Sequence, residues 1–246
     1  MGERRRRGAK PVTELVYPPV MGALRATFVG LGLKLQVHGG ENVPRAGGAV
    51  LASNHVSHLD FVFVGLGARP SGRLVRFMAK KAVFDHPVAG PLMRGMKHIP
   101  VDREAGASSY AEALRRLRAG EVIGVFPEAT ISRSFQPKEF KTGAVRLARA
   151  TRTPLIPVAV WGTQRLWTYD ERSSLKQRGV PIAVWVGEPV DPSGDQHEAT
   201  SRLREAVRGL LDQARAGYPD DGSGAWWQPA DLGGTAPTPA TFGDDT

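Results

Sequence analysis

The sequence predicts a single-domain α/β fold, a sandwich in which a mixed or mainly parallel sheet is flanked by helices. Three observations support this prediction. Short apolar runs of strand length alternate along the chain with stretches of helical spacing. The 246 residues are enough to bury one sizeable core. The apolar content of 41% and the charged content of 23% are ordinary for a globular protein.

The predicted elements follow one another in chain order. Strands are expected at residues 33–37, 49–52, 74–79, 122–126, 155–160 and 182–186, and helices at 59–66, 108–118, 142–150 and 201–216. The helix at 108–118 begins at the N-cap residue Ser108 and ends before Gly120. The apolar residues of the last helix form one stripe that predicts packing against the sheet, namely Leu203, Val207, Leu210, Leu211 and Ala214.

The N-terminal part is expected to contact a membrane surface. Residues 1–12 read as a basic, flexible N-terminus, and residues 13–34 as one or two amphipathic helical pieces divided near Pro18-Pro19. The apolar run inside this segment is shorter than the roughly 18 residues that a spanning helix needs. We therefore expect the segment to lie in the interface of an anionic membrane, with an ordinary helix packed on the core as the alternative.

The two ends of the chain differ in charge. Residues 35–216 form the predicted catalytic domain, and residues 217–246 form an acidic tail rich in Gly and Pro, for which we expect disorder. Trp226-Trp227 is the one strongly apolar element of this tail, and we expect it to form either a docking contact or a membrane contact. The net charge of the whole chain is +9. Because the tail holds five Asp and no Lys or Arg, the positive charge is concentrated in the rest of the chain.

The excess of positive charge suits anionic partners such as phospholipid headgroups, phosphate substrates or coenzyme A. Solubility alone is the simpler explanation. We expect no nucleic-acid partner, because the basic residues are scattered, aromatic residues are few and no recognised nucleic-acid motif occurs. The absence of Cys excludes disulfides, thiolate metal ligands and a cysteine nucleophile.

His55 and Asp60 are the candidate catalytic residues. They place an imidazole and a carboxylate five residues apart, where a strand-like run gives way to a helix-like one. A neutral imidazole can take a proton from an attacking hydroxyl, while a carboxylate on its other nitrogen fixes the tautomer. His58 could share a helical face with His55 and bind a metal. No metal is expected, because neither a metalloprotease Glu nor any Cys accompanies the pair.

Three further blocks follow in order: Ile99-Pro-Val-Asp-Arg103, Val125-Phe-Pro-Glu-Ala-Thr130 and Leu155-Ile-Pro-Val-Ala-Val160. With the Asn54-His55 block, they resemble the bacterial 1-acyl-sn-glycerol-3-phosphate acyltransferase family. That family carries an NHxxxxD block, a block ending in Asp-Arg, an FPEGTRS-type block and a final apolar block with proline. The resemblance spans about residues 35–190, and all four blocks stand in the family order.

The resemblance implies a membrane-associated glycerolipid acyltransferase. Such an enzyme moves a fatty acyl group from acyl-CoA or acyl-carrier protein to the free hydroxyl of lysophosphatidic acid, giving phosphatidic acid. His55 would be the general base and Asp60 would orient it, without a covalent enzyme intermediate and without a cofactor. The location implied is the cytoplasmic side of the cell membrane, as a peripheral or monotopic protein.

Arg103 is the first candidate for the phosphate of the acceptor, because a guanidinium grips a phosphate at two points. The alternative is that Arg103 pairs with Asp102 or Glu104 on a solvated loop. Glu128 follows a strand at the sheet edge, where open α/β folds place ligands. It is expected either to accept hydrogen bonds from the acceptor or to hold the acceptor-binding loop, and Thr130 belongs to the same block.

The third block departs from the family pattern at two positions. Ala129 replaces the usual Gly, and Ile131 stands where the family usually has Arg. We expect Arg133 to reach the same phosphate by another path. Two lysines are further phosphate candidates: Lys141, which precedes a predicted helix start, and Lys80, which directly follows a predicted strand.

These departures leave the acceptor open. Glycerol-3-phosphate, another lysophospholipid or a glycolipid could replace lysophosphatidic acid without any change in the chemistry. An alternative of another class is a non-catalytic protein that binds lipid or nucleic acid. That protein would consume no thioester with any acceptor.

Overall fold

The computed structural model describes residues 14–102, 106–170 and 172–238. These residues form a seven-stranded sheet in the order β1-β7-β6-β2-β5-β3-β4. The strands are β1 (Lys34–His38), β2 (Ala49–Ser53), β3 (Val75–Lys80), β4 (Ile99–Val101), β5 (Val122–Val125), β6 (Leu155–Trp161) and β7 (Pro181–Val186). All neighbouring strands are parallel except the antiparallel pair β6 and β7. The prediction of a single-domain α/β fold with a mainly parallel mixed sheet is confirmed.

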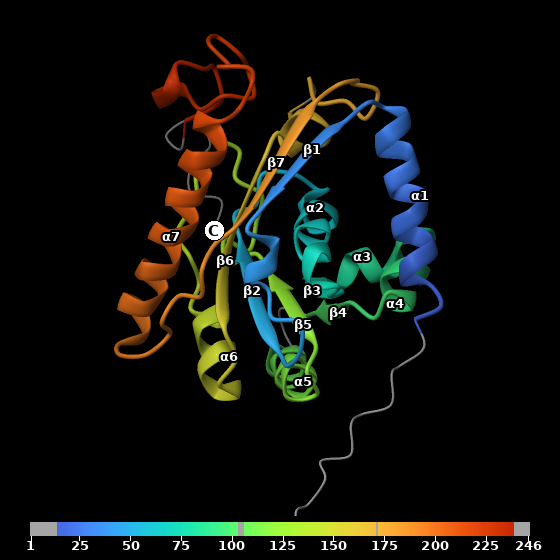
Figure 1. Ribbon diagram of the computed structural model, residues 1–246, viewed down its shortest axis with the longest axis vertical. Coiled ribbons are helices and arrows are strands. Elements are labelled where there is room, and N and C mark those ends of the chain that lie inside the picture. Colours follow the sequence, from blue (N-terminus) through green and yellow to red (C-terminus); the bar gives the residue numbers. More distant parts are fainter. Residues whose placement is uncertain (1–13, 103–105, 171, 239–246) are drawn as a thin grey trace, which may run out of the picture.

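Helices cover both faces of this sheet (Figure 1). One face carries α1 (Tyr17–Gly30), α2 (Asp60–Gly67), α3 (Lys81–Asp85) and α4 (Ala89–Gly95). The other face carries α5 (Gly106–Arg118), α6 (Gly143–Thr151) and α7 (Gln196–Ala216). The described residues also contain four single 3-10 turns, namely η1 (Gly40–Asn42), η2 (Arg69–Ser71), η3 (Thr163–Arg165) and η4 (Ala230–Leu232).

The central strand β2 shows how the two hydrophobic cores divide. Ala49 and Leu51 point into the core beneath α2, and Val50 and Ala52 point into the core beneath α5, α6 and α7. Successive side chains of a strand point to opposite faces. A strand buried on both faces is therefore apolar at every position, as the continuous run in β2 is.

Strand β4 was not expected from the sequence. It has only three residues, and Pro100 is its middle one. Proline lacks the N–H that a central strand needs, so within sheets it is confined to edges and bulges. The position of β4 at the edge of the sheet satisfies this restriction.

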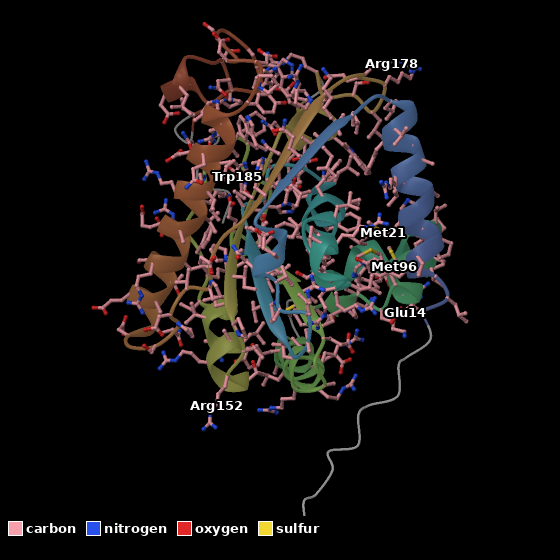
Figure 2. The ribbon with its side chains drawn as sticks, viewed as in Figure 1. Glu14, Met21, Met96, Arg152, Arg178 and Trp185 are labelled. Carbon is pink, nitrogen blue, oxygen red and sulfur yellow. The ribbon has the colours of Figure 1, made fainter. Side chains whose placement is uncertain are left out.

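Of the one or two helical pieces expected for residues 13–34, the structure has one, helix α1, which is not divided at Pro18-Pro19. The two prolines occupy the first turn of the helix, where a missing N–H costs nothing. The helix packs on the α2 face, where Phe28 stacks on Phe63 with ring centroids 4.9 Å apart. Near its start, Met21 lies beside Met96, which follows α4 (Figure 2).

Both ends of α1 are fastened to the body of the domain. At its start, the hydroxyl of Tyr17 donates to the carbonyl of Val75 in β3, at 3.3 Å. At its end, the N–H of Gly179 donates to the carbonyl of Leu31, at 2.9 Å. Arg178 donates to the carbonyl of Gly30 at 3.1 Å, and Figure 2 shows Arg178 at this end of the helix. In the described ranges no helix is long and apolar enough to span a membrane.

The expected disorder of the tail is wrong for residues 218–238, here called the C-terminal segment. This segment folds back beyond the end of α7 (Figure 1). Its Tyr218, Trp227 and Ala236 are buried in one cluster with Trp161 and Leu211. Burial of large aromatic surfaces outweighs the Gly- and Pro-rich composition from which disorder was expected. Residues 1–13 and 239–246 lie outside the described residues.

Candidate active site

The candidate residues gather at one edge of the sheet because their strands are parallel. Strands β2, β3, β5 and β6 point the same way, so their carboxyl ends meet at this edge. His55 follows β2, Phe126 and Glu128 follow β5, and Thr163 follows β6. In open α/β folds, this is the edge where ligands bind.

His55 and Asp60, the candidate catalytic pair, are in direct contact. The Nδ1 atom of His55 lies 2.9 Å from Oδ2 of Asp60. Asp60 is fully buried at the start of α2, whereas the side chain of His55 is 19% exposed. The imidazole also stacks on Phe126, with ring centroids 4.1 Å apart. Because Asp60 engages Nδ1, Nε2 is the ring nitrogen that remains to accept a proton.

The Asp60 carboxylate also shapes the loop that carries His55. Its Oδ2 accepts the N–H groups of Val56 at 2.7 Å and of Ser57 at 2.8 Å. Its Oδ1 accepts the hydroxyl of Thr163 at 2.6 Å. A buried carboxylate needs such donors to replace lost water. The sequence gives no sign of this role for Thr163, because the residue lies about a hundred positions away and outside every recognised block.

Asn54 fastens the same loop to β6. Its side-chain NH₂ donates to the carbonyl of Val160 at 3.0 Å, and its side-chain oxygen accepts the N–H of Val160 at 2.8 Å. The side chain is buried, so both of its polar ends are satisfied within the protein. Asn54 therefore fixes the end of β2 against β6, directly before His55.

Glu128 holds two loops together. Its Oε1 accepts the N–H of His55 at 2.8 Å, and its Oε2 accepts the N–H of Lys138 at 3.0 Å. Burial raises the pKa of this carboxyl to about 8, while the two N–H donors act in the opposite direction. Of the two roles expected for Glu128, this geometry supports loop holding, because both oxygens are engaged by backbone groups.

The two departures from the family pattern have structural correlates. Ala129 has a φ of +62°, a left-handed conformation that costs a non-glycine residue about 1–2 kcal/mol. This conformation explains why glycine is usual at the position. The side chain of Ile131 is only 6% exposed. Position 131 therefore points into the protein, and in this chain it presents no group to a phosphate.

The expected cationic residues are spread around this edge. Arg133 is exposed, and its guanidinium lies over the ring of Tyr169 at 5.1 Å from the ring centroid. Lys80 is exposed at the end of β3. Lys141 is exposed just before Thr142, the N-cap residue of α6. Arg103 lies outside the described residues.

Lys138 is a further cation that the sequence analysis did not single out. Its ammonium group donates to the hydroxyl of Thr130, at 3.1 Å. Its backbone N–H is the one that Glu128 accepts. Lys138 therefore lies beside the third block, and a positive charge stands next to Thr130.

His58 belongs to an aromatic group at the rim of the site. Its ring centroid lies 5.0 Å from that of Trp167 and 5.2 Å from that of Tyr169. Burial lowers the pKa of His58, and the nearby His55 and Lys80 lower it further. In the described ranges, no group of three or more His, Cys, Asp or Glu side chains could hold a metal ion.

Comparisons with known proteins place the chain among acyltransferase sequences. Residues 34–161 match the family model described as Acyltransferase. The 1-acyl-sn-glycerol-3-phosphate acyltransferase of Bacillus subtilis (strain 168) is 29% identical over 180 residues, which cover 73% of this chain and 85% of that protein. The protein of the same name from Limnanthes douglasii is 32% identical over 180 residues, covering 72% of this chain and 60% of that protein.

A solved structure shares the fold. It is the crystal structure of the 1-acyl-sn-glycerophosphate (LPA) acyltransferase from Thermotoga maritima, and it matches with a TM-score of 0.65. The match covers 79% of this chain and 78% of that chain, at 23% sequence identity. At this identity, the likeness supports the architecture described above.

Proposed function

Because the chain belongs to the Acyltransferase family, we propose that it transfers a fatty acyl group to the free hydroxyl of 1-acyl-glycerol-3-phosphate. The product is phosphatidic acid, and the reaction belongs to phospholipid biosynthesis. The names of the relatives support this acceptor. The observation that carries the proposal is the contact of 2.9 Å between His55 and Asp60 at the carboxyl edge of the sheet.

His55 acts as the general base in this reaction. Its Nε2 takes the proton of the acceptor hydroxyl while that oxygen attacks the thioester carbonyl. The buried Asp60 carboxylate stabilises the imidazolium that forms. As the new C–O bond is made, the C–S bond breaks and the imidazolium returns the proton to the leaving thiolate. The acceptor itself is the nucleophile, so the protein needs no covalent intermediate.

The acceptor phosphate binds among the cationic residues of this edge. Arg133 is exposed on the loop after β5, and Lys80 is exposed at the end of β3, two strands on the same side of β2. Lys141 adds a cation close to the start of α6, whose free N–H groups favour anions. We also assign Arg103, which follows β4 in the chain, to the phosphate.

The acyl donor is acyl-CoA or acyl-carrier protein, and the site needs no cofactor or metal. The lipid acceptor requires access to a membrane surface, on the cytoplasmic side of the cell membrane. Helix α1 supports this access, because Val29 near its end is 71% exposed. The basic residues at the start of the chain add attraction to anionic lipid.

The proposal is tested by following thiol release and lipid product with purified protein, palmitoyl-CoA and a panel of acceptors in detergent or anionic vesicles. We expect rapid conversion of 1-acyl-glycerol-3-phosphate. His55→Ala should lower turnover by about 10²–10⁴, the usual contribution of a general base. His197→Ala, at an exposed position of α7, is the control and should leave turnover unchanged.

Near-normal turnover in a folded His55→Ala protein would overturn the mechanism. Turnover that depends on His55 but needs glycerol-3-phosphate, another lysophospholipid or a glycolipid would replace the acceptor. The buried Ile131 favours keeping these acceptors in the panel, because an arginine is usual there in the family pattern. If no acceptor leads to consumption of palmitoyl-CoA, and none does so when palmitoyl-acyl-carrier protein replaces it as donor, the result would point to a binding protein.

A further inference from the structure

We propose that the C-terminal segment, residues 218–238, positions the catalytic pair and acts through the 3-10 turn η3. This inference rests on the proposed function, since it concerns the same pair of residues. The family model ends at residue 161, before η3 and before the segment. Three consecutive residues of η3 connect the Asp60 carboxylate on one side with the C-terminal segment on the other.

The first residue of the turn, Thr163, holds Asp60. Its hydroxyl donates to Oδ1 of Asp60 at 2.6 Å, and both side chains are fully buried. The other oxygen of Asp60 carries the bond to His55. Because the carboxylate is planar, a fixed position of Oδ1 fixes the direction in which Oδ2 meets the imidazole. Thr163 is therefore a positioning residue for His55.

The second residue, Gln164, faces the C-terminal segment. Its side-chain NH₂ donates to the carbonyl of Trp227 at 3.2 Å. Its side-chain oxygen accepts the N–H of Gly162 at 2.9 Å, and Gly162 has a φ of +93°. An added Cβ at Gly162 would lie 2.2 Å from the carbonyl oxygen of Pro181, so only glycine fits there. Gln164 thus joins the segment to the sharp bend from which η3 starts.

The third residue, Arg165, grips the same segment with its charge. Its guanidinium lies over the ring of Trp227, 4.6 Å from the ring centroid. It forms an ion pair with Asp220 at 3.1 Å and contacts the hydroxyl of Tyr218 at 3.4 Å. Cation–π and ionic contacts of a half-buried guanidinium are stronger than those of an exposed one. Loss of the segment would leave Arg165 without these partners.

A second route connects the segment to the catalytic loop. The buried Trp227 belongs to the same hydrophobic cluster as Val56, Phe135 and Trp161. Val56 directly follows His55, and its N–H bonds to Asp60. Without the indole, the cluster would be open to water and the 55–57 loop would lose part of its support. The segment therefore stabilises the loop as well as the carboxylate that orients its histidine.

The main test uses Thr163→Val, Thr163→Ser and Trp227→Ala, with turnover and KM measured for both substrates. Thr163→Val removes the donor to Asp60 and keeps the shape, so we expect kcat to fall about tenfold with KM within about twofold. Thr163→Ser should restore kcat, because it restores the hydroxyl. The acid limb of the kcat/KM profile should move to higher pH in Thr163→Val, since a carboxylate with one donor fewer favours the imidazolium more strongly.

Trp227→Ala should also lower kcat about tenfold at temperatures well below its Tm. Combined with Thr163→Val, its effect should be clearly less than the product of the two single effects, because both act through η3. Because Trp227 is buried, a milder pair of variants accompanies it. Asp220→Asn, which loses the ion pair with Arg165, should lower kcat about twofold. Asp221→Asn, at the exposed neighbouring position, should leave kcat unchanged.

A lowered Tm with normal kcat in folded Trp227→Ala and Asp220→Asn would show a purely structural segment and overturn the proposal. Multiplicative effects of Thr163→Val and Trp227→Ala would do the same. A readout independent of turnover separates this outcome from a wrong function. The Nδ1–H proton resonance of His55, identified by its loss in His55→Ala, should broaden in Trp227→Ala. An unchanged resonance would overturn the positioning role, whatever reaction the protein performs.

Discussion

Two histidines of this protein, His55 and His98, have opposite surroundings. His55 meets the Asp60 carboxylate and is partly exposed. His98 is 4% exposed, and its Nδ1 accepts the N–H of Phe77 at 3.0 Å. Burial, followed by the charges of Arg76 and Arg116, lowers the pKa of His98 to about 3. The same side chain is thus suited to proton transfer in one place and kept neutral in the other.

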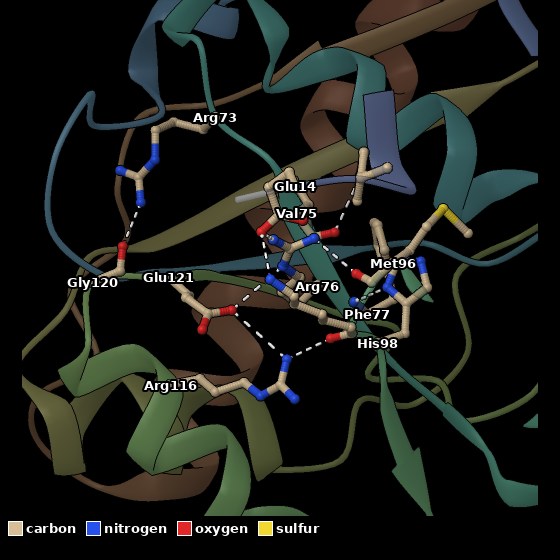
Figure 3. A network of polar contacts seen from close by, with 12 residues as sticks. Glu14, Arg73, Val75, Arg76, Phe77, Met96, His98, Arg116, Gly120 and Glu121 are labelled. Atoms are coloured by element: carbon tan, nitrogen blue, oxygen red, sulfur yellow. Dashed lines mark hydrogen bonds and ion pairs between the residues drawn. The ribbon is translucent and has the colours of Figure 1, made fainter. Parts of the chain in front are cut away.

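His98 lies beside an arginine cluster formed by Glu14, Arg76, Arg116 and Glu121 (Figure 3). Buried Arg76 donates to Glu14 at 2.5 Å and to the carbonyl of Met96 at 2.8 Å. The cluster joins the start of α1 to β3 and α5. His55, by contrast, is partly exposed, and its partner is the buried Asp60 carboxylate. The comparison supports a role in stability for the arginine cluster, and for His55 and Asp60 the catalytic role that we propose.

The largest expected effect comes from replacing one carboxylate in each region by its amide. Asp60→Asn presents an NH₂ group where Thr163, His55 and two backbone N–H groups all donate. We expect turnover to fall by about 10²–10⁴, since the amide no longer fixes the tautomer of His55. Glu14→Gln in the arginine cluster should leave kcat unchanged. Steady-state kinetics of both proteins check this contrast, and equal losses would contradict it.

The next effect concerns stability alone. Arg76→Met leaves the Glu14 carboxylate without its main partner and removes the bond to Met96. Breaking a buried ion pair on one side costs about 3–5 kcal/mol. Urea denaturation should show this loss, while kcat measured below the transition stays within about twofold of the wild type. A large fall in kcat of the folded variant would show that the arginine cluster also serves catalysis.

The pH dependence of the free energy of unfolding should reflect the protonation of His98. Its pKa is about 3 in the folded protein and 6.5 in the ordinary case, so the unfolded chain binds a proton first as the pH falls. The contribution of neutral His98 is complete above pH 6.5 and is lost progressively toward pH 3. Between pH 6.5 and pH 5, the loss is about 2 kcal/mol.

Replacing His98 by a side chain that does not titrate isolates this contribution. His98→Asn keeps an acceptor for Phe77 and should remove most of the dependence, when unfolding is measured by urea at several pH values. His197→Asn, at an exposed position on α7, is the matched control and should keep the wild-type slope. An unchanged slope in His98→Asn would show that other groups dominate the acid loss.

The smallest expected effect lies in the loop next to the catalytic pair. Ala129→Gly relieves the left-handed strain at φ +62° and increases the freedom of the unfolded chain. The net gain should be about 0.5–1 kcal/mol, or about 2 °C in Tm. Gly143→Ala, at an open position in the first turn of α6, provides a reference for a Gly–Ala difference without such strain. A lower Tm in Ala129→Gly would show that the strain is negligible.

Local pattern predicted most of the fold. The strand and helix runs were readable because burial on one or two faces leaves a periodic signal. The short edge strand β4 left no such signal, and the prolines near residue 18 were read as a break although they begin a helix. The C-terminal segment is ordered because its Trp227 packs into the hydrophobic cluster around Trp161. Composition alone could not show that contact.

The site, like the fold, contains features that the sequence predicted and features that it did not. The approach of His55 to Asp60 could be predicted, because five residues bridge the strand end and the first turn of a helix. The position of Glu128 at the same sheet edge followed from its strand. Thr163 and the inward direction of Ile131 could not be predicted. They depend on distant packing and on a loop held by the bond from the N–H of Ser132 to the carbonyl of His55, at 2.7 Å.

The attachment of α1 at both of its ends has a mechanical consequence. Its start is tied to β3 through Tyr17, and its end to the strand-side backbone at Gly179. A helix fixed at two points cannot swing on a hinge, so it turns only together with the sheet. Any surface that captures α1 therefore also sets the tilt and the height of the His55 imidazole above that surface. The distance that His55 can reach from that surface would then be fixed by rigid geometry, and inserting residues ahead of residue 14 should leave it unchanged.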